Sequence, residues 1–262
     1  MAAESSAKKK GVVDLVILLD VTASMQECIE AVKRNVVSFI TTLSTKNENN
    51  ESPVKDWRIK VCGYRDQTYD SEWFVDNPFV NGIAAVQGQL QAPNMQASGG
   101  GDEPESLLDA LYKVAEMGAT GAQDSVSPDR WRPLGLARRV VVFFTDATFK
   151  TPMTTPEKTG GQVGDVITAI LGSRLTVIGF APEWSGYVEL CAADRFQLEP
   201  YVIAESCPAL AGLGKPGEEG KVAQRAAVQA LKDISADSKG FKDLMIQLAK
   251  TVSQPGAEPE EA

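Results

Sequence analysis

The sequence predicts an α/β fold, a Rossmann-like doubly wound sheet that is mostly parallel and has helices on both faces. Two observations carry this prediction. Nearly continuous apolar runs, such as Val12–Leu19 and Arg138–Thr145, are typical of parallel strands that are covered on both faces. Segments with apolar residues at helical spacing alternate with these runs, and the connections are long enough for crossovers.

The elements follow in chain order. Strands are expected at residues 12–19, 57–64, 73–75 (a short edge strand), 138–145, 175–180 and 197–203. Helices are expected at residues 29–43, 81–90, 164–171 and 184–193. Another helix is expected to have Pro104 in its first turn and to bury Leu107, Leu108, Leu111 and Val114. Proline fits the first turn of a helix, because its missing N–H has no partner there.

The domain organisation follows from the same pattern. We expect a flexible N-terminus at 1–11, one α/β domain at 12–206, a helical extension at 207–252 that packs on the domain, and a disordered tail at 253–262. The connection 118–137 is long for a loop, and the sequence leaves its role open.

Composition excludes several classes of function. The chain has 35 acidic and 26 basic residues, for a net charge of −9, which disfavours nucleic acid and anionic membranes as partners. It has no histidine, so the usual general base and zinc ligand are missing. The four cysteines are far apart, and no secretory h-region precedes the first strand. We expect a cytoplasmic protein.

The candidate site lies where strands are predicted to end. Asp20 follows the first strand with Thr22 and Ser24 in the next turn, and Asp146 follows the strand at 138–145. Ligands of open α/β sheets bind beyond the carboxyl ends of the strands. Magnesium takes oxygen ligands and keeps several waters beside one or two carboxylates. This set of side chains therefore predicts a divalent-cation site.

Two motifs resemble those of the von Willebrand factor A domain family. The segment DVTAS, at 20–24, resembles the family's DxSxS motif, and FFTDA, at 143–147, resembles its later strand that ends in an aspartate. The resemblance implies a metal-ion-dependent adhesion site for Mg²⁺, or Mn²⁺ or Ca²⁺, held by Asp20, Thr22, Ser24 and Asp146. It also implies a protein partner whose carboxylate completes the metal shell.

The middle loop departs from the family pattern. Adhesive members have a threonine after the glycines, whereas here Asp102 follows Gly99–Gly101 and is the expected fifth ligand. The segment GGGDEPE resembles a branch found in bacterial and alpha-kinase-linked A domains. A third carboxylate would reduce the affinity of the metal for a partner's carboxylate. Other interpretations remain open: the glycines form a tight turn, and Glu103 and Glu105 favour a helix N-terminus.

The function expected is a non-catalytic, metal-dependent protein-binding module with a regulatory or assembly role. One alternative is a scaffold with a degenerate metal site that binds through the helices at 222–252. Another is a magnesium-dependent phosphohydrolase. The haloacid dehalogenase phosphatases use DxDx[TV], whereas position 22 is threonine, and no P-loop motif is present. Arg65 and Asp66 also end a strand, where a surface ion pair is the simplest interpretation.

Overall fold

The computed structural model describes residues 11–27, 29–44, 54–181, 184–193 and 196–198. The predicted C-terminal extension, the tail, most of the N-terminal segment and residues 199–203 of the strand expected at 197–203 lie outside these residues.

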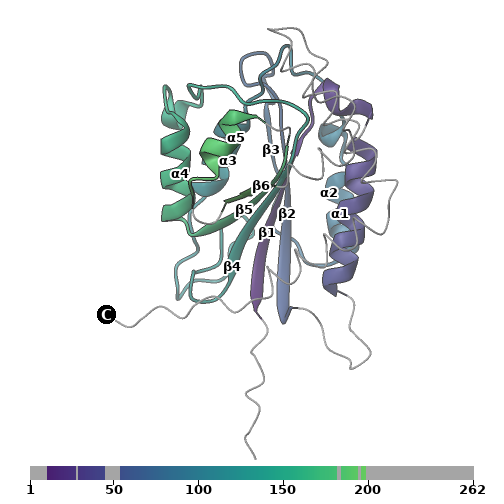
Figure 1. Ribbon diagram of the computed structural model, residues 1–262. Helices are drawn as coiled ribbons and strands as arrows, with labels where there is room; N and C mark the ends of the chain where they lie inside the picture. Colours follow the sequence, from purple (N-terminus) through teal and green to yellow (C-terminus); the bar gives the residue numbers. More distant parts are fainter. Residues whose placement is uncertain (1–10, 28, 45–53, 182–183, 194–195, 199–262) are drawn as a thin grey trace, which may run out of the picture.

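A six-stranded sheet forms the centre of the molecule, in the order β3-β2-β1-β4-β5-β6 (Figure 1). The strands are β1 (Val12–Asp20), β2 (Asp56–Tyr64), β3 (Phe74–Asp76), β4 (Arg138–Phe144), β5 (Leu175–Phe180) and β6 (Phe196–Leu198). All neighbouring pairs are parallel except β2 and β3. The prediction of a doubly wound, mostly parallel α/β sheet is confirmed.

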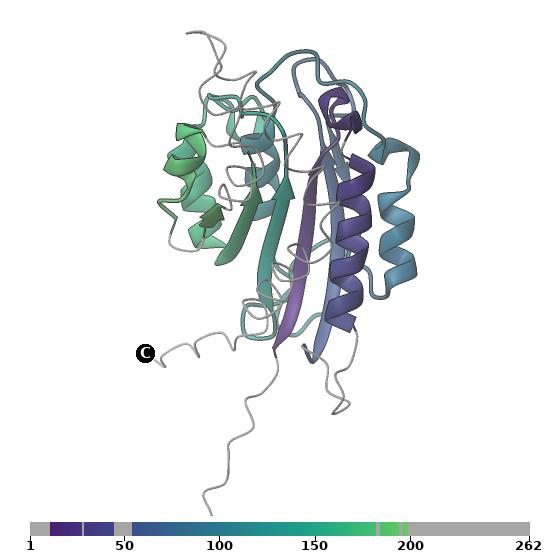
Figure 2. The same cartoon turned by 45° about the vertical axis from the view of Figure 1, so that its right-hand side comes forward.

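Helices cover both faces of this sheet. They are α1 (Ile29–Ser44), α2 (Ile83–Leu90), α3 (Leu107–Ala115), α4 (Val163–Gly172) and α5 (Ser185–Leu190). Figures 1 and 2 show α1 and α2 on one face and α3, α4 and α5 on the other. Side chains of β1 alternate between the two cores: Leu15 and Ile17 join the first, and Val16 joins the second. None of the helices described is long and apolar enough to cross a bilayer.

Helix α3 begins three residues later than the sequence predicts. Pro104 lies in the preceding loop, and the first helical residue is Leu107. The reason is a contact distant in sequence: the Glu105 N–H donates to the Thr148 carbonyl at 3.0 Å, and the Glu105 carbonyl accepts from the Lys150 N–H at 2.8 Å. This bridge fixes residue 105 as extended backbone, so the helix can start only after it.

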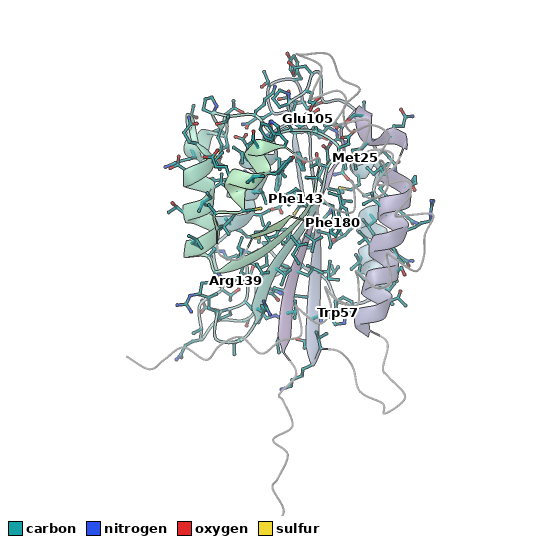
Figure 3. All side chains as sticks on the ribbon, in the orientation of Figure 1. Met25, Trp57, Glu105, Arg139, Phe143 and Phe180 are labelled. Atoms are coloured by element: carbon teal, nitrogen blue, oxygen red, sulfur yellow. The ribbon has the colours of Figure 1, made fainter. Side chains whose placement is uncertain are left out.

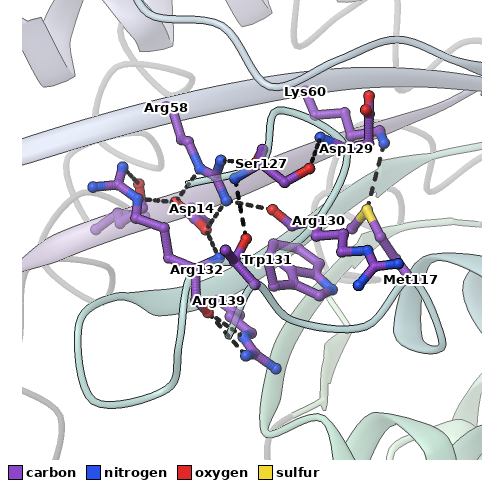
Figure 4. Close-up of polar contacts among 12 residues, drawn as sticks. Asp14, Arg58, Lys60, Met117, Ser127, Asp129, Arg130, Trp131, Arg132 and Arg139 are labelled. Atoms are coloured by element: carbon purple, nitrogen blue, oxygen red, sulfur yellow. Dashed lines mark hydrogen bonds and ion pairs between the residues drawn. The ribbon is translucent and has the colours of Figure 1, made fainter. Parts of the chain in front are cut away.

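The connection 118–137 packs against the edge of the sheet where β1 and β2 begin. Asp14 of β1 is fully buried and accepts hydrogen bonds from the Nε atoms of Arg58 and Arg132 at 2.8 and 2.7 Å (Figure 4). Arg58 also donates to the carbonyls of Ser127 and Arg130. Trp131 is buried and donates to the Val114 carbonyl at 3.1 Å. The connection thus closes the core opposite the predicted site.

Candidate metal centre

The site lies at the carboxyl ends of the two central strands. Asp20 is the last residue of β1, and Asp146 lies two residues beyond β4. These strands are parallel neighbours, with Leu19 opposite Phe144, so their ends meet at one edge of the sheet. The chain proceeds from β1 to β2 on one side and from β4 to β5 on the other. This is the switch point at which open α/β sheets bind their ligands.

A continuous chain of polar contacts joins four of the five predicted ligands. Asp20 Oδ1 accepts hydrogen bonds from the Thr22 N–H at 2.9 Å and from the Thr22 hydroxyl at 2.6 Å. The hydroxyl oxygens of Thr22 and Ser24 lie 3.0 Å apart. The Ser24 hydroxyl donates to Asp146 Oδ1 at 3.0 Å. The structure therefore brings together residues separated by more than 120 positions in the sequence.

Burial makes the two carboxylates of this chain unusual. Asp20 and Asp146 are both 0% exposed. Loss of solvent raises the pKa of Asp20 above its ordinary value, although hydrogen bonds from Thr22 and Thr145 oppose this effect. Burial, together with the nearby charge of Asp20, raises the pKa of Asp146 to about 7. Asp146 Oδ2 is buried without a hydrogen-bond partner. Such an oxygen is costly unless a ligand satisfies it.

Thr145 is a supporting residue that the sequence analysis did not single out. Its hydroxyl donates to Asp20 Oδ2 at 2.7 Å and accepts from the Ala147 N–H at 3.1 Å. It therefore occupies the second oxygen of Asp20 and orients that carboxylate. Its place directly before Asp146, inside the FFTDA motif, is the signal that could have identified it.

The three glycines pack against the loop that carries Thr22. Gly99, Gly100 and Gly101 all have positive φ values, of 72°, 99° and 74°. The Gly99 carbonyl accepts from the Ala23 N–H at 3.1 Å. A Cβ atom at Gly100 would lie 2.8 Å from Glu105 Oε1 and 3.0 Å from Thr22 Cβ. The glycines thus provide a turn and also a close approach of two loops that a side chain would prevent.

Asp102, the fifth predicted ligand, has different partners. Its side chain is 56% exposed, and its carboxylate forms an ion pair with Lys150 Nζ at 3.3 Å. It makes no hydrogen bond to the other four predicted ligands among the described residues. Its assignment as a metal ligand remains a prediction that the structure does not test.

Glu105 lies closer to the predicted ligands than the sequence suggested. It is 5% exposed, and its Oε2 atom has no hydrogen-bond partner. Burial, followed by the charges of Asp20 and Asp66, raises its pKa to about 10. The sequence alone indicates only that Glu105 is favourable near a helix N-terminus. Its burial depends on the bridge to residues 148–150, for which the local sequence carries no signal.

The interpretation of Arg65 and Asp66 as a surface ion pair is wrong. Asp66 is fully buried and pairs with Lys150, while Arg65 is 6% exposed. The Arg65 guanidinium donates to the carbonyls of Asn94, Gln96 and Ser98, at 2.8 to 3.0 Å. Arg65 thus supports the segment that leads into the glycine loop.

The residues present fit a hard divalent cation. Across the described parts of the chain, no three acidic, histidine or cysteine side chains converge closely enough to hold a metal by themselves. The donor set at this edge consists instead of two carboxylates and two hydroxyls, with the unsatisfied oxygen of Asp146 among them. Magnesium suits such a set, because it keeps several waters and needs few carboxylates.

Comparisons with known proteins add structural similarity at low sequence identity. No family model matches the chain, and no curated protein sequence matches it. Among solved structures, it is similar to proximal thread matrix protein 1 from the mussel byssus with a zinc-occupied MIDAS motif, at 10% identity and a TM-score of 0.48 over 84% of this chain. It is also similar to the pilus adhesin SpaC from Lactobacillus rhamnosus GG, at 11% identity and a TM-score of 0.44 over 88% of this chain. The matches cover 47% and 30% of those two chains, so this chain spans less than half of each.

Proposed function

We propose that this chain is a von Willebrand factor A-type module that binds a divalent cation and uses it to bind a protein partner, without catalysing a reaction. Asp20, Thr22, Ser24 and Asp146 would hold the ion, and Mg²⁺ is the cation that their oxygen donors suit best. The observation that carries the proposal is the polar chain from Asp20 to Asp146, which ends in a buried carboxylate oxygen without a partner.

The position of the site supports a role in binding. Ser24 is exposed, whereas Thr22 and both carboxylates are buried. A cation held here would offer a positive charge at the surface, to which an oxygen of a partner protein can bind. In a chain with a net charge of −9, such a local positive charge would also direct where an acidic partner can dock.

A phosphohydrolase is the less favoured alternative. In the haloacid dehalogenase type, an acid two residues after the first aspartate donates the proton. Position 22 is a threonine whose hydroxyl is hydrogen-bonded to Asp20 at 2.6 Å. The other alternative, binding through the predicted C-terminal helices, concerns residues outside those described.

A thermal melt tests the proposal. The full chain is treated with a chelator and melted with and without millimolar Mg²⁺, Mn²⁺ or Ca²⁺, beside Asp20→Ala. A ligand that binds only the folded state at a hundredfold excess over its Kd adds about 2.7 kcal/mol, which corresponds to roughly 5–10 °C in Tm for a domain of this size. A shift in the wild type that the variant lacks supports the site. The absence of a shift with every ion would refute it.

A further inference from the structure

We propose that Glu105, rather than Asp102, supplies the third acidic side chain of the metal centre. This inference rests on the proposed function, because it concerns the same cation. The spacing of the sequence predicts that the middle loop contributes Asp102, three residues earlier, as the metal ligand.

The backbone of Glu105 is fixed beside the segment that follows Asp146. Its N–H donates to the Thr148 carbonyl at 3.0 Å, and its carbonyl accepts from the Lys150 N–H at 2.8 Å. Figure 3 shows Glu105 at the same edge of the sheet as Met25, which lies just after the loop carrying Thr22, and at the opposite edge from Arg139. The backbone of Glu105 is thus held at the site by the segment 148–150.

The side chain of Glu105 is directed toward the predicted ligands. Its Oε1 atom and Thr22 Cβ both border the space beside Gly100, since a Cβ placed at Gly100 would lie 2.8 Å from the first and 3.0 Å from the second. The residue is also only 5% exposed. The Glu105 carboxyl group therefore lies close to Thr22, in space that the missing side chain of Gly100 leaves free.

One carboxyl oxygen of Glu105 lacks a hydrogen-bond partner among the described residues. Its Oε2 atom is buried without a hydrogen bond, as is Asp146 Oδ2. None of the ion pairs among the described residues includes Glu105, Asp20 or Asp146. Buried polar oxygens are normally satisfied, so two unsatisfied acidic oxygens at one edge indicate a cation as the missing partner.

Asp102, in contrast to Glu105, is exposed and has an ion-pair partner. Its carboxylate is more than half exposed and is already paired with Lys150, which also contacts Asp66. The described acidic side chains do not converge into a cage of their own, so Glu105 would act on the cation through the waters that Mg²⁺ retains in its shell. Carboxylates that act around such a shell typically change metal affinity 10- to 100-fold when they are removed.

Two nearly isosteric variants test the inference. Glu105→Gln and Asp102→Asn are titrated with Mg²⁺ and Mn²⁺ by calorimetry, in the full chain after chelator treatment. We expect Glu105→Gln to weaken the affinity at least tenfold and Asp102→Asn to change it less than twofold. An affinity of Glu105→Gln within twofold of the wild type, or an equal loss in Asp102→Asn, would overturn the inference.

Further variants keep the outcome interpretable. If Glu105→Gln does not fold, Glu105→Asp is used instead, because aspartate keeps the charge but is shorter by one methylene. A several-fold loss of Mn²⁺ affinity is then expected, and unchanged affinity would overturn the inference. Wild type and Asp20→Ala separate the two proposals: a wild type that binds no metal refutes the proposed function. Binding that needs Asp20 but is indifferent to Glu105 refutes only this inference.

Discussion

Replacing Asp146 by asparagine should abolish metal binding and at the same time make the metal-free protein more stable. The substitution keeps the shape of the side chain and leaves an oxygen that can accept the hydrogen bond from Ser24. It removes a negative charge that is 0% exposed and close to the charge of Asp20. If the carboxylate of Asp146 instead stabilised the fold, the same substitution would make the metal-free protein less stable.

The size of the effect follows from the pKa of Asp146. Burial raises that pKa from 3.8 to about 7. At pH 8, where the group is ionised in both states, this difference corresponds to roughly 4 kcal/mol of destabilisation of the folded, metal-free protein. The asparagine has amide hydrogens to satisfy in the same buried place, at a cost of about 1–3 kcal/mol. The net gain expected is therefore about 1–3 kcal/mol.

Urea unfolding in the presence of a chelator measures this gain. At pH 8, the midpoint of Asp146→Asn should lie roughly 0.3–1 M above that of the wild type. At pH 5 the difference should shrink, because the wild-type carboxyl group is then protonated. Asp102→Asn is the matched control: its charge is exposed and paired with Lys150, so the midpoint should barely change. A midpoint for Asp146→Asn below that of the wild type at pH 8 would refute the reasoning, because the charge would then be compensated within the chain.

Three other predictions concern pH, the opposite edge of the sheet and the glycine loop. Between about pH 5 and 9, the folded, metal-free protein holds a proton on Glu105 that the unfolded chain releases, because the folded pKa of Glu105 is about 10. The free energy of unfolding should therefore fall as the pH rises through this range. Urea unfolding curves that show a rise would contradict this prediction. Asp14→Asn should cost about 3–5 kcal/mol in urea unfolding, because it leaves the buried guanidinium of Arg58 without a carboxylate and that of Arg132 with only the half-exposed Asp56. Asp56→Asn removes a carboxylate that is 48% exposed and leaves Arg132 paired with Asp14, so it should cost less than about 1 kcal/mol. Gly100→Ala should weaken Mg²⁺ binding in calorimetry, because the added Cβ would contact Glu105 and Thr22. Gly82 has a similar φ of 95° but open space around it, so Gly82→Ala should lower stability without changing metal affinity. Equal metal affinity in the two variants would refute the argument that Gly100 permits a close approach of two loops.

The order of strands and helices could be predicted from the sequence because it depends on local patterns. The apolar runs at β1 and β4 and the helical spacing in α1 are properties of neighbouring residues. The start of α3 could not be predicted in this way. Its position depends on a bridge between Glu105 and Phe149, which are 44 residues apart, and local preference for a proline in a first helical turn gave the wrong boundary.

Part of the candidate site could likewise be predicted from local patterns, and part could not. Asp20, Thr22, Ser24 and Asp146 follow directly from strand ends, which the sequence places well. The direction of each side chain in the middle loop does not, because three successive positive φ values remove any simple periodicity. From spacing alone, Asp102 and Glu105 are both carboxylates near the glycines, and only the folded chain shows that one is exposed and the other buried.

The two edges of the sheet use buried charge in different ways. At the edge where β1 begins, the buried carboxylate of Asp14 is fully compensated by Arg58 and Arg132, and the loop 118–137 is held in place as a result. At the edge where β1 ends, Asp20 and Asp146 are equally buried but have no ion pair among the described residues, and the cation nearby, Lys150, is bound to Asp66 and Asp102. Uncompensated buried charge is costly in a folded protein unless a ligand balances it. The same sheet thus compensates its buried charge internally where β1 begins, whereas the described residues give Asp20 and Asp146 no ion-pair partner where β1 ends, as the proposed cation site requires.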